Sequence, residues 1–168
     1  LCSFSMYSQS NFSKFKKLSS PKKWWVCFHP FKAKRALNIS NEVIKVTDSV
    51  YKSLIIGDDI SGGKIDAFRH AFWMAKLRQS IGKRAARSLG RAHEKENYQY
   101  FLANKLEDGT LPDKASMDMD LYNNEVGLSL VLRREKTSKL TVINRVIFAI
   151  EEGMMLVIKK DSSKRYLS

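Results

Sequence analysis

The chain has 168 residues, 43% of them hydrophobic, which predicts one globular domain with a single core. Its 30 Lys and Arg against 17 Asp and Glu give a net charge of +13, which favours anionic partners, including an anionic substrate or a membrane surface. The basic residues are spread along the chain without a long run, so nucleic acid is not a favoured partner. The oligomeric state is left open.

The N-terminal part of the chain is expected to lie outside the folded domain. Residues 1–9 are apolar, hydroxyl-rich and uncharged, and we interpret them as the remnant of a signal peptide, with a short apolar strand as the alternative. A signal peptide predicts a secreted or periplasmic protein. Residues 10–23 are rich in Ser and Lys and predict a flexible basic linker. The helical domain is expected at 24–160, followed by a tail at 161–168.

An aromatic cluster, Trp-Trp-Val-Cys-Phe-His-Pro-Phe at 24–31, begins the predicted domain. We expect it to be extended and to pack across the helices as a lid. A membrane-interface anchor is the alternative, because Lys22 and Lys23 adjoin the two Trp residues. His29 precedes Pro30, which disfavours helix at that residue and predicts a capping or surface histidine.

Apolar residues recur at three- and four-residue spacing in the remainder of the chain, which predicts helices. The expected helices span about 33–54, with a second start at Ser40 as an alternative, 64–81, 83–98, 115–134 and 138–160. Residues 99–114 are a polar connection long enough to cover a pocket. We therefore predict an all-α, single-domain bundle of five or six helices with an N-terminal extended aromatic segment.

The predicted helix at 64–81 carries Asp66, Arg69, His70 and Trp73 at i, i+3, i+4 and i+7, which places them on one face. The opposite face is apolar, so we expect neighbouring helices to enclose this one. A polar stripe is costly to bury unless its groups have partners. The stripe is therefore the centre of the predicted site.

The next predicted helix contributes His93, which shares its side of the helix with the small residues Ala86 and Gly90. These small residues would allow a close approach to a neighbouring helix. Glu94 is expected at the flank, one turn from Arg91, and we rank it below His93 as a site residue.

A third group of polar residues lies on the helix predicted at 115–134. Asp120, Asn123 and Asn124 fall on one face, whereas Asp118 lies on the opposite face and is expected to point to water. Asparagine has a poor propensity for helix interiors, so a pair there indicates a specific role.

The three motifs D-x-x-R-H-x-x-W, A-H-E and M-D-x-x-N-N-x-x-G follow one another within about residues 60–130. In this order they resemble a bacterial domain family of unknown function, found in secreted proteins and at the ends of toxin-like polypeptides. Members of that family more often carry His where this chain has Tyr122. The resemblance implies that one site includes Asp66, Arg69, His70, Trp73, His93, Glu94, Asp120, Asn123 and Asn124.

One functional hypothesis is a secreted hydrolase that acts on an anionic phosphodiester, lipid or envelope polymer. We predict His70, His93, Asp66 and Asp120 as its catalytic residues. Either imidazole would be the general base that activates water or a hydroxyl, with a carboxylate orienting its second nitrogen. Imidazoles and carboxylates enclosed together have environments that push their pKa values apart, as acid–base catalysis requires.

The remaining predicted site residues would bind the substrate: Arg69, Trp73, Glu94, Asn123 and Asn124. Arg69 would hold a phosphate or carboxylate through its planar guanidinium. The two amides could donate to a developing oxyanion, and Trp73 would shape the pocket.

The cofactor is unknown, and a divalent metal is a second version of this site. Its ligands would be His70, His93 and Asp120, with Glu94 as the base, because two imidazoles and a carboxylate suit zinc. The sequence has no His-Glu-x-x-His motif, and Arg69 would repel a cation, so a metal is not favoured.

Enzymatic activity itself remains open on the sequence alone. The alternative is a non-catalytic binding or structural module in which the Asp, Arg, His and Asn residues form a buried hydrogen-bond network that fixes the helices in register.

Overall fold

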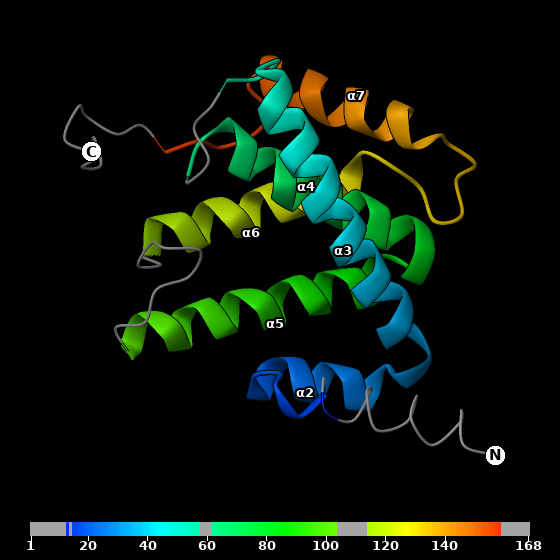
Figure 1. The fold of residues 1–168 in the computed structure, drawn as a ribbon, viewed down its shortest axis with the longest axis vertical. Coiled ribbons are helices and arrows are strands. Elements are labelled where there is room, and N and C mark those ends of the chain that lie inside the picture. The colour runs from blue at the N-terminus through cyan, green and yellow to red at the C-terminus, as the bar shows by residue number, and fades with distance from the viewer. Residues whose placement is uncertain (1–12, 14, 58–61, 104–113, 159–168) are drawn as a thin grey trace.

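The computed structural model describes residues 13, 15–57, 62–103 and 114–158. Its helices are α2 (Ser20–Phe28), α3 (Pro30–Ser53), α4 (Lys64–Ile81), α5 (Lys83–Leu102), α6 (Lys114–Ser129) and α7 (Lys139–Glu151). No strand occurs within these residues. The prediction of an all-α, single-domain bundle of five or six helices is confirmed (Figure 1).

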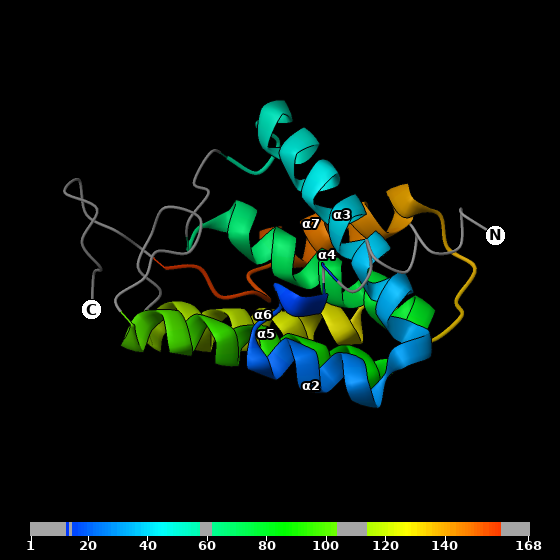
Figure 2. The same ribbon diagram turned by 60° about the horizontal axis from the view of Figure 1, so that its bottom comes forward.

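Helix α4 is the centre of the bundle and contacts α3, α5, α6 and α7. Figures 1 and 2 show α5 and α6 running alongside each other, with α2 beside α5 and with α3 running from the end of α2 across α4. The apolar face of α4 supplies the fully buried Phe68 and Phe72, whose rings stack with centroids 5.4 Å apart. Enclosure of α4, expected from its sequence, is therefore confirmed.

Helices α4 and α6 approach each other backbone to backbone at Gly127. A Cβ atom added there would lie 2.2 Å from the carbonyl oxygen of Ala71, a distance that no side chain can tolerate. Only glycine therefore permits this contact, which brings the polar face of α6 against His70 of α4.

The aromatic segment at 24–31 is helical where extended structure was predicted, so that prediction is wrong. Helix α2 begins at Ser20 with Pro21 in its first turn, a position where proline is tolerated because its missing N–H would have no helical partner. Trp25 is buried and its Nε1 donates to the carbonyl oxygen of Ala85, at 3.1 Å, and to Ser88 Oγ, at 2.9 Å. The Trp25 indole therefore docks α2 onto α5. The apolar run at 24–31 was too short for its periodicity to predict a helix.

The start of α2 also shortens the predicted linker, because residues 20–23 are helical. His29 has extended φ and non-helical ψ angles (−132°, 48°) and separates α2 from α3, as expected from Pro30. Residues 1–9 and 161–168, interpreted as a leader and a tail, lie outside the described residues.

Other predicted boundaries also differ from the structure. Helix α5 continues to Leu102, into the connection predicted at 99–114. Helix α3 is continuous, so the second start at Ser40 is wrong: the Ser40 hydroxyl donates to the carbonyl oxygen of Ala36 within the helix. Helices α6 and α7 end earlier than predicted, because the apolar residues after each one pack as irregular chain, with Val131 and Met155 buried. None of the described helices is long and apolar enough to cross a membrane.

Candidate functional site

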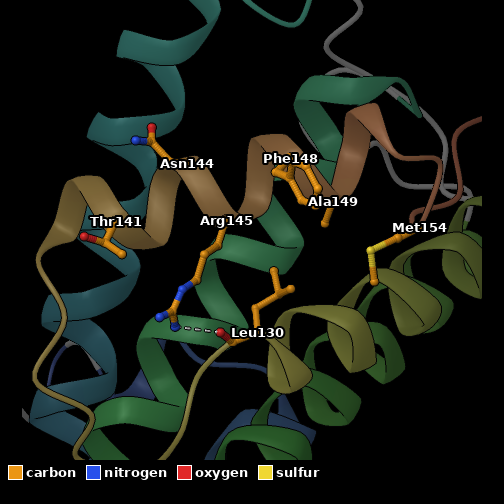
Figure 3. Close-up of a pocket in the computed structure, with 7 residues that line it drawn as sticks. All are labelled: Leu130, Thr141, Asn144, Arg145, Phe148, Ala149 and Met154. Carbon is orange, nitrogen blue, oxygen red and sulfur yellow. Dashed lines mark hydrogen bonds between the residues drawn. The ribbon is translucent and has the colours of Figure 1, made fainter.

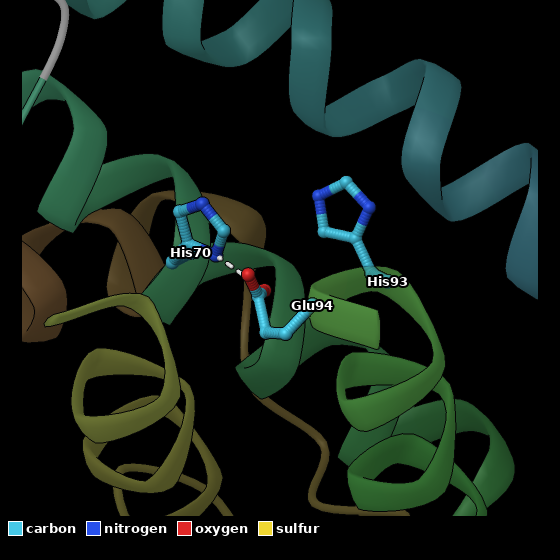
Figure 4. A group of neighbouring side chains, drawn as sticks. All are labelled: His70, His93 and Glu94. Atoms are coloured by element: carbon cyan, nitrogen blue, oxygen red, sulfur yellow. Dashed lines mark ion pairs between the residues drawn. The ribbon is translucent and has the colours of Figure 1, made fainter. Parts of the chain in front are cut away.

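His70 is the centre of the polar cluster and is 2% exposed. Its Nε2 lies 3.3 Å from Asp120 Oδ1 on α6 and 3.6 Å from Asp66 Oδ1 on α4. Its Nδ1 faces Glu94 Oε1 of α5 at 3.9 Å, as Figure 4 shows. Three helices therefore bring carboxylates to both nitrogens of one imidazole.

Asp66 is fixed at the beginning of α4 by three donated hydrogen bonds. The backbone N–H of Gly62 donates to Oδ2 at 2.9 Å, and Arg69 donates to Oδ1 through Nε at 3.2 Å and Nη2 at 2.6 Å. Burial alone would raise the pKa of Asp66, but Arg69, His70 and the Gly62 hydrogen bond outweigh it and lower this pKa. The Arg69 side chain is 32% exposed, so it links the buried carboxylate to the surface.

Both histidines of the cluster are neutral near pH 7. Burial, with the charge of Arg69 next in size, lowers the pKa of His70 to about 3. Burial also lowers the pKa of His93, helped by Lys22 and Arg69 and opposed by Glu96. A neutral imidazole retains one lone pair, so each ring can accept a proton or bind a metal.

His93 has a carboxylate partner that the sequence did not lead us to predict. Its Nδ1 lies 3.7 Å from Glu96 Oε2, and Glu96 also forms an ion pair with Lys22 of α2. Burial acts to raise the pKa of Glu96, but hydrogen bonds from His93, Lys22 and Ser19 lower it to about 2. The spacing of Glu96, three residues after His93, was the available signal.

Trp73 connects His93 to helix α3. Its ring contacts His93 edge to face, with centroids 5.5 Å apart, and its Nε1 donates to Ser40 Oγ at 2.9 Å. The rings of His70 and His93 stack with centroids 6.0 Å apart. Trp73 therefore lies at one side of the cluster, and its role in shaping a substrate pocket stays a prediction.

Glu94 is 4% exposed and faces His70, where the sequence suggested a flanking surface residue. The Nδ2 of Asn97 donates to its Oε2 at 3.1 Å, and the Nδ2 of Asn124 donates to its Oε1 at 3.5 Å. The contacts of α5 with both α4 and α6 turn this flank inward. Glu94 is therefore more central than our sequence ranking assumed, and Asn97 is a neighbour that the ranking missed.

The two asparagines of α6 have different partners. Asn124 Oδ1 lies 3.4 Å from His70 Nδ1, inside the cluster. Asn123 instead pairs with the backbone of Leu156, donating to its carbonyl oxygen at 2.9 Å and accepting from its N–H at 3.0 Å. Asn123 thus holds the segment that follows α7, and its substrate contact stays a prediction. Asp118 is exposed, as predicted, and forms an ion pair with Lys114.

Two groups of three residues are close enough to hold a cation. They are His70, His93 and Glu94, and Asp66, His70 and Asp120, with the donor atoms of each group within 4.8 Å of one another. The metal ligands predicted from sequence, His70, His93 and Asp120, are divided between these groups.

A cavity of about 190 Å³ reaches the cluster between α5 and α6. It is lined by Met74, Arg87, Gly90, Arg91, Leu121, Asn124 and Glu125. Asn124 faces both this cavity and His70, which makes it the link between them. A larger cavity of about 520 Å³ lies against α7 and involves none of the predicted site residues (Figure 3).

Comparison with known families places these residues in one recognised unit. The model of a family described as "Domain of unknown function (DUF6973)" matches residues 23–154. The chain belongs to this family. The match includes α4, α5 and α6 with all nine predicted site residues. Searches of curated proteins and of solved structures find no match.

Proposed function

We propose that this domain is a secreted or periplasmic hydrolase that acts on an anionic phosphodiester, lipid or envelope polymer. The observation that supports it is the enclosure of His70, His93 and three carboxylates from α4, α5 and α6 in one cluster. Titratable groups gathered with displaced pKa values are typical of catalytic sites, although ion-pair networks share this property. The residues that would do the chemistry are therefore those around His70.

In this proposal, water is activated on the Nδ1 side of His70, between His93 and Glu94 (Figure 4). The water oxygen would attack the phosphorus or carbonyl atom as its proton passes to one of these groups. The bond from that atom to the leaving group would break, and the leaving group would take up the same proton. Asp66 and Asp120 would orient His70 from its Nε2 side. Arg69 is partly exposed and would hold the anionic part of the substrate.

The cavity between α5 and α6 supports an anionic substrate. Arg87 and Arg91 line it, and Arg87 is engaged by Glu125 at 2.5 Å and 2.6 Å. With a volume of about 190 Å³, it suits one small group of a larger substrate, such as a phosphate.

Hydrolysis can be tested with the purified protein on bis(4-nitrophenyl) phosphate, anionic phospholipid vesicles and peptidoglycan. We expect turnover of one class and a loss of about 100-fold or more in His93→Gln. His29→Gln is the control, because His29 lies between α2 and α3 and outside the cluster. The proposal fails if none of the three is hydrolysed, or if His93→Gln retains the full rate.

A non-catalytic module is the second candidate, and the burial of the cluster favours it. His70, Asp120 and Asn124 are 2%, 5% and 3% exposed, as expected for a network that fixes helix register. This alternative predicts that His93→Gln changes the melting temperature and no enzymatic rate.

We also propose an anionic membrane surface as a partner. Trp24, Phe28 and Phe31 are 66%, 76% and 95% exposed at the junction of α2 and α3. Aromatic side chains beside lysines favour the headgroup region, and the net charge of +13 adds attraction to anionic lipids.

A further inference from the structure

We infer that His70, His93 and Glu94 form a binding site for a divalent transition-metal ion of the zinc class. Their donor atoms lie within 4.8 Å of one another, and the three side chains come from the facing helices α4 and α5 (Figure 4). Two imidazoles and one carboxylate are a ligand set that zinc accepts while leaving a fourth position open.

The surroundings of His70 determine which of its nitrogens is available. Asp66 and Asp120 both approach Nε2, at 3.6 Å and 3.3 Å. Two carboxylates there stabilise the tautomer that carries its proton on Nε2. The lone pair is then on Nδ1, the nitrogen that faces Glu94. A carboxylate behind the distal nitrogen is the usual support of a metal-binding histidine.

With that tautomer, the side chains of His70, Glu94 and Asn124 meet at one point. Glu94 Oε1 and Asn124 Oδ1 lie 3.9 Å and 3.4 Å from His70 Nδ1. A cation there would replace the hydrogen bonds that Asn124 makes with His70 Nδ1 and Glu94 Oε1, and its ligands would lie at about 2.0–2.2 Å each. The Asn97 amide donates to Glu94 Oε2 at 3.1 Å, while Oε1 accepts the longer hydrogen bond, at 3.5 Å, from Asn124 Nδ2.

His93 is supported in the same way as His70. Its Nδ1 faces Glu96 at 3.7 Å, and Lys22 holds Glu96 in place from α2. With Nδ1 directed at Glu96, His93 would bind a metal through Nε2.

The charge of Arg69, which argued against a metal on the sequence alone, is largely compensated in the structure. Its guanidinium donates twice to Asp66 Oδ1, on the Nε2 side of His70. The second group of three is disfavoured because the hydrogen bonds to Asp66 from Gly62 and Arg69 are short, at 2.9 Å and 2.6 Å. Those to Glu94 are longer, at 3.1 Å and 3.5 Å. The geometry therefore favours the Nδ1 side for the cation.

As an account of how hydrolysis occurs, this inference rests on the proposed function. A divalent ion at this position would make a water molecule acidic near neutral pH. As a statement about metal binding, it can be measured without any substrate.

Metal binding is tested on the full chain after treatment with a chelator, by titration with Zn²⁺ in a calorimeter and with Co²⁺ by visible absorption. We expect one ion per chain and visible bands typical of a Co²⁺ site with fewer than six ligands. His93→Gln and Glu94→Gln should each weaken Zn²⁺ binding by about 100-fold or more, whereas Glu96→Gln, behind His93, should weaken it by about 10-fold to 100-fold.

Two matched variants serve as controls: His29→Gln for histidine and Asp118→Asn for an exposed carboxylate on α6. Both should bind Zn²⁺ as the unmodified protein does. Because His93 is at the edge of the cluster, with its side chain 15% exposed, His93→Gln should fold even if Glu94→Gln does not. Circular dichroism checks this.

The inference is overturned if no ion binds at a one-to-one ratio, or if folded His93→Gln binds as tightly as the controls. It is also overturned if Asp120→Asn abolishes binding while Glu94→Gln leaves it intact, which would place the ion at Nε2. Zinc binding without hydrolysis of any substrate would contradict the proposed function alone. Hydrolysis by a protein that binds no ion would contradict the metal site alone.

Discussion

Two regions reverse the usual burial of apolar and exposure of polar side chains. One is the cluster around His70, and the other is the aromatic corner, formed by Trp24, Phe28 and Phe31 at the junction of α2 and α3. The cluster buries ionisable and amide groups, with Asp66, His70 and Glu94 at 8%, 2% and 4% exposure. The corner exposes large aromatic rings, with Phe31 at 95%. Buried polar groups and exposed apolar ones are the two informative exceptions to the rule that apolar residues lie inside.

The two regions are also built differently. Three helices hold the cluster, and the backbone contact at Gly127 fixes the distance between α4 and α6. The corner is formed by the short helix α2 and the first two residues of α3. Trp25 is the buried side chain of α2. Changes in the cluster should therefore alter stability and function together, whereas changes at the corner should alter function alone.

The largest expected effect is that of Gly127→Ala, which separates α4 from α6. The new Cβ would meet backbone atoms of Ala71 at 2.2–2.7 Å, and backbone cannot move aside as a side chain can. We expect a loss of about 3 kcal/mol, which corresponds to a fall of about 10 °C in melting temperature.

Gly90→Ala on α5 is the matched control for this prediction. Its Cβ would meet the flexible end of Met74 at 3.3 Å, and alanine is the better helix former. Thermal unfolding should therefore differ little from that of the unmodified protein. Equal losses in the two variants would show that backbone contact at Gly127 does not hold the cluster together.

The paired asparagines of α6 allow structure and binding to be separated. Asn123→Ala removes both hydrogen bonds to Leu156 and should cost about 2 kcal/mol in unfolding free energy, with Zn²⁺ affinity unchanged. Asn124→Ala should lower Zn²⁺ affinity by about 10-fold, because Asn124 contacts both His70 and Glu94. Chemical denaturation and calorimetry measure the two quantities. A reversed pattern would assign the site contact to Asn123.

Stability should fall as the pH is lowered from about 6.5, without added metal. The pKa of His70 is about 3 in the folded state and about 6.5 in the unfolded state, so the unfolded chain binds more protons in between. The free energy that neutral His70 contributes to stability is fully present above pH 6.5 and is lost as the pH falls towards 3. Asp66 and Glu96, with lowered pKa values, act in the same direction below about pH 4.5.

The variant His70→Gln should flatten the loss of stability between pH 6.5 and 4.5, whereas His29→Gln should leave it unchanged. Melting temperatures recorded across this range provide the measurement. An unaltered slope in folded His70→Gln would mean that the cluster does not keep His70 neutral.

Most of the fold and much of the cluster could be predicted because they depend on local periodicity. The 3.6-residue repeat predicted α4 at the observed residues. It also predicted that Asp66 and His70 share one face, and Asp66 Oδ1 lies 3.6 Å from His70 Nε2 in the structure. The same repeat was too short to identify α2, whose stability depends on the docking of Trp25 onto α5. The predicted ends of α6 and α7 were wrong because the apolar pattern continues beyond the last residue of each helix.

The parts of the site that the sequence did not reveal depend on how helices pack. A helical wheel places Glu94 at a flank of α5. The packing of α5 against α4 and α6 buries this flank, which the sequence of α5 alone does not indicate. Asn123 lies on the predicted face but reaches the segment after α7, whose path no local pattern describes. Glu96 acquires its role from Lys22, which is distant in sequence.

The smallest effect on stability is expected at the aromatic corner. The double change Trp24→Ala with Phe31→Ala removes exposed rings and should change unfolding free energy by no more than about 0.5 kcal/mol. Binding to anionic phospholipid vesicles, measured by co-sedimentation, should nevertheless fall by about 10-fold or more. Phe148→Ala is the control, since Phe148 is 59% exposed on α7. If Phe148→Ala reduces vesicle binding as much, attraction is a general property of this basic surface and the corner is not a membrane anchor.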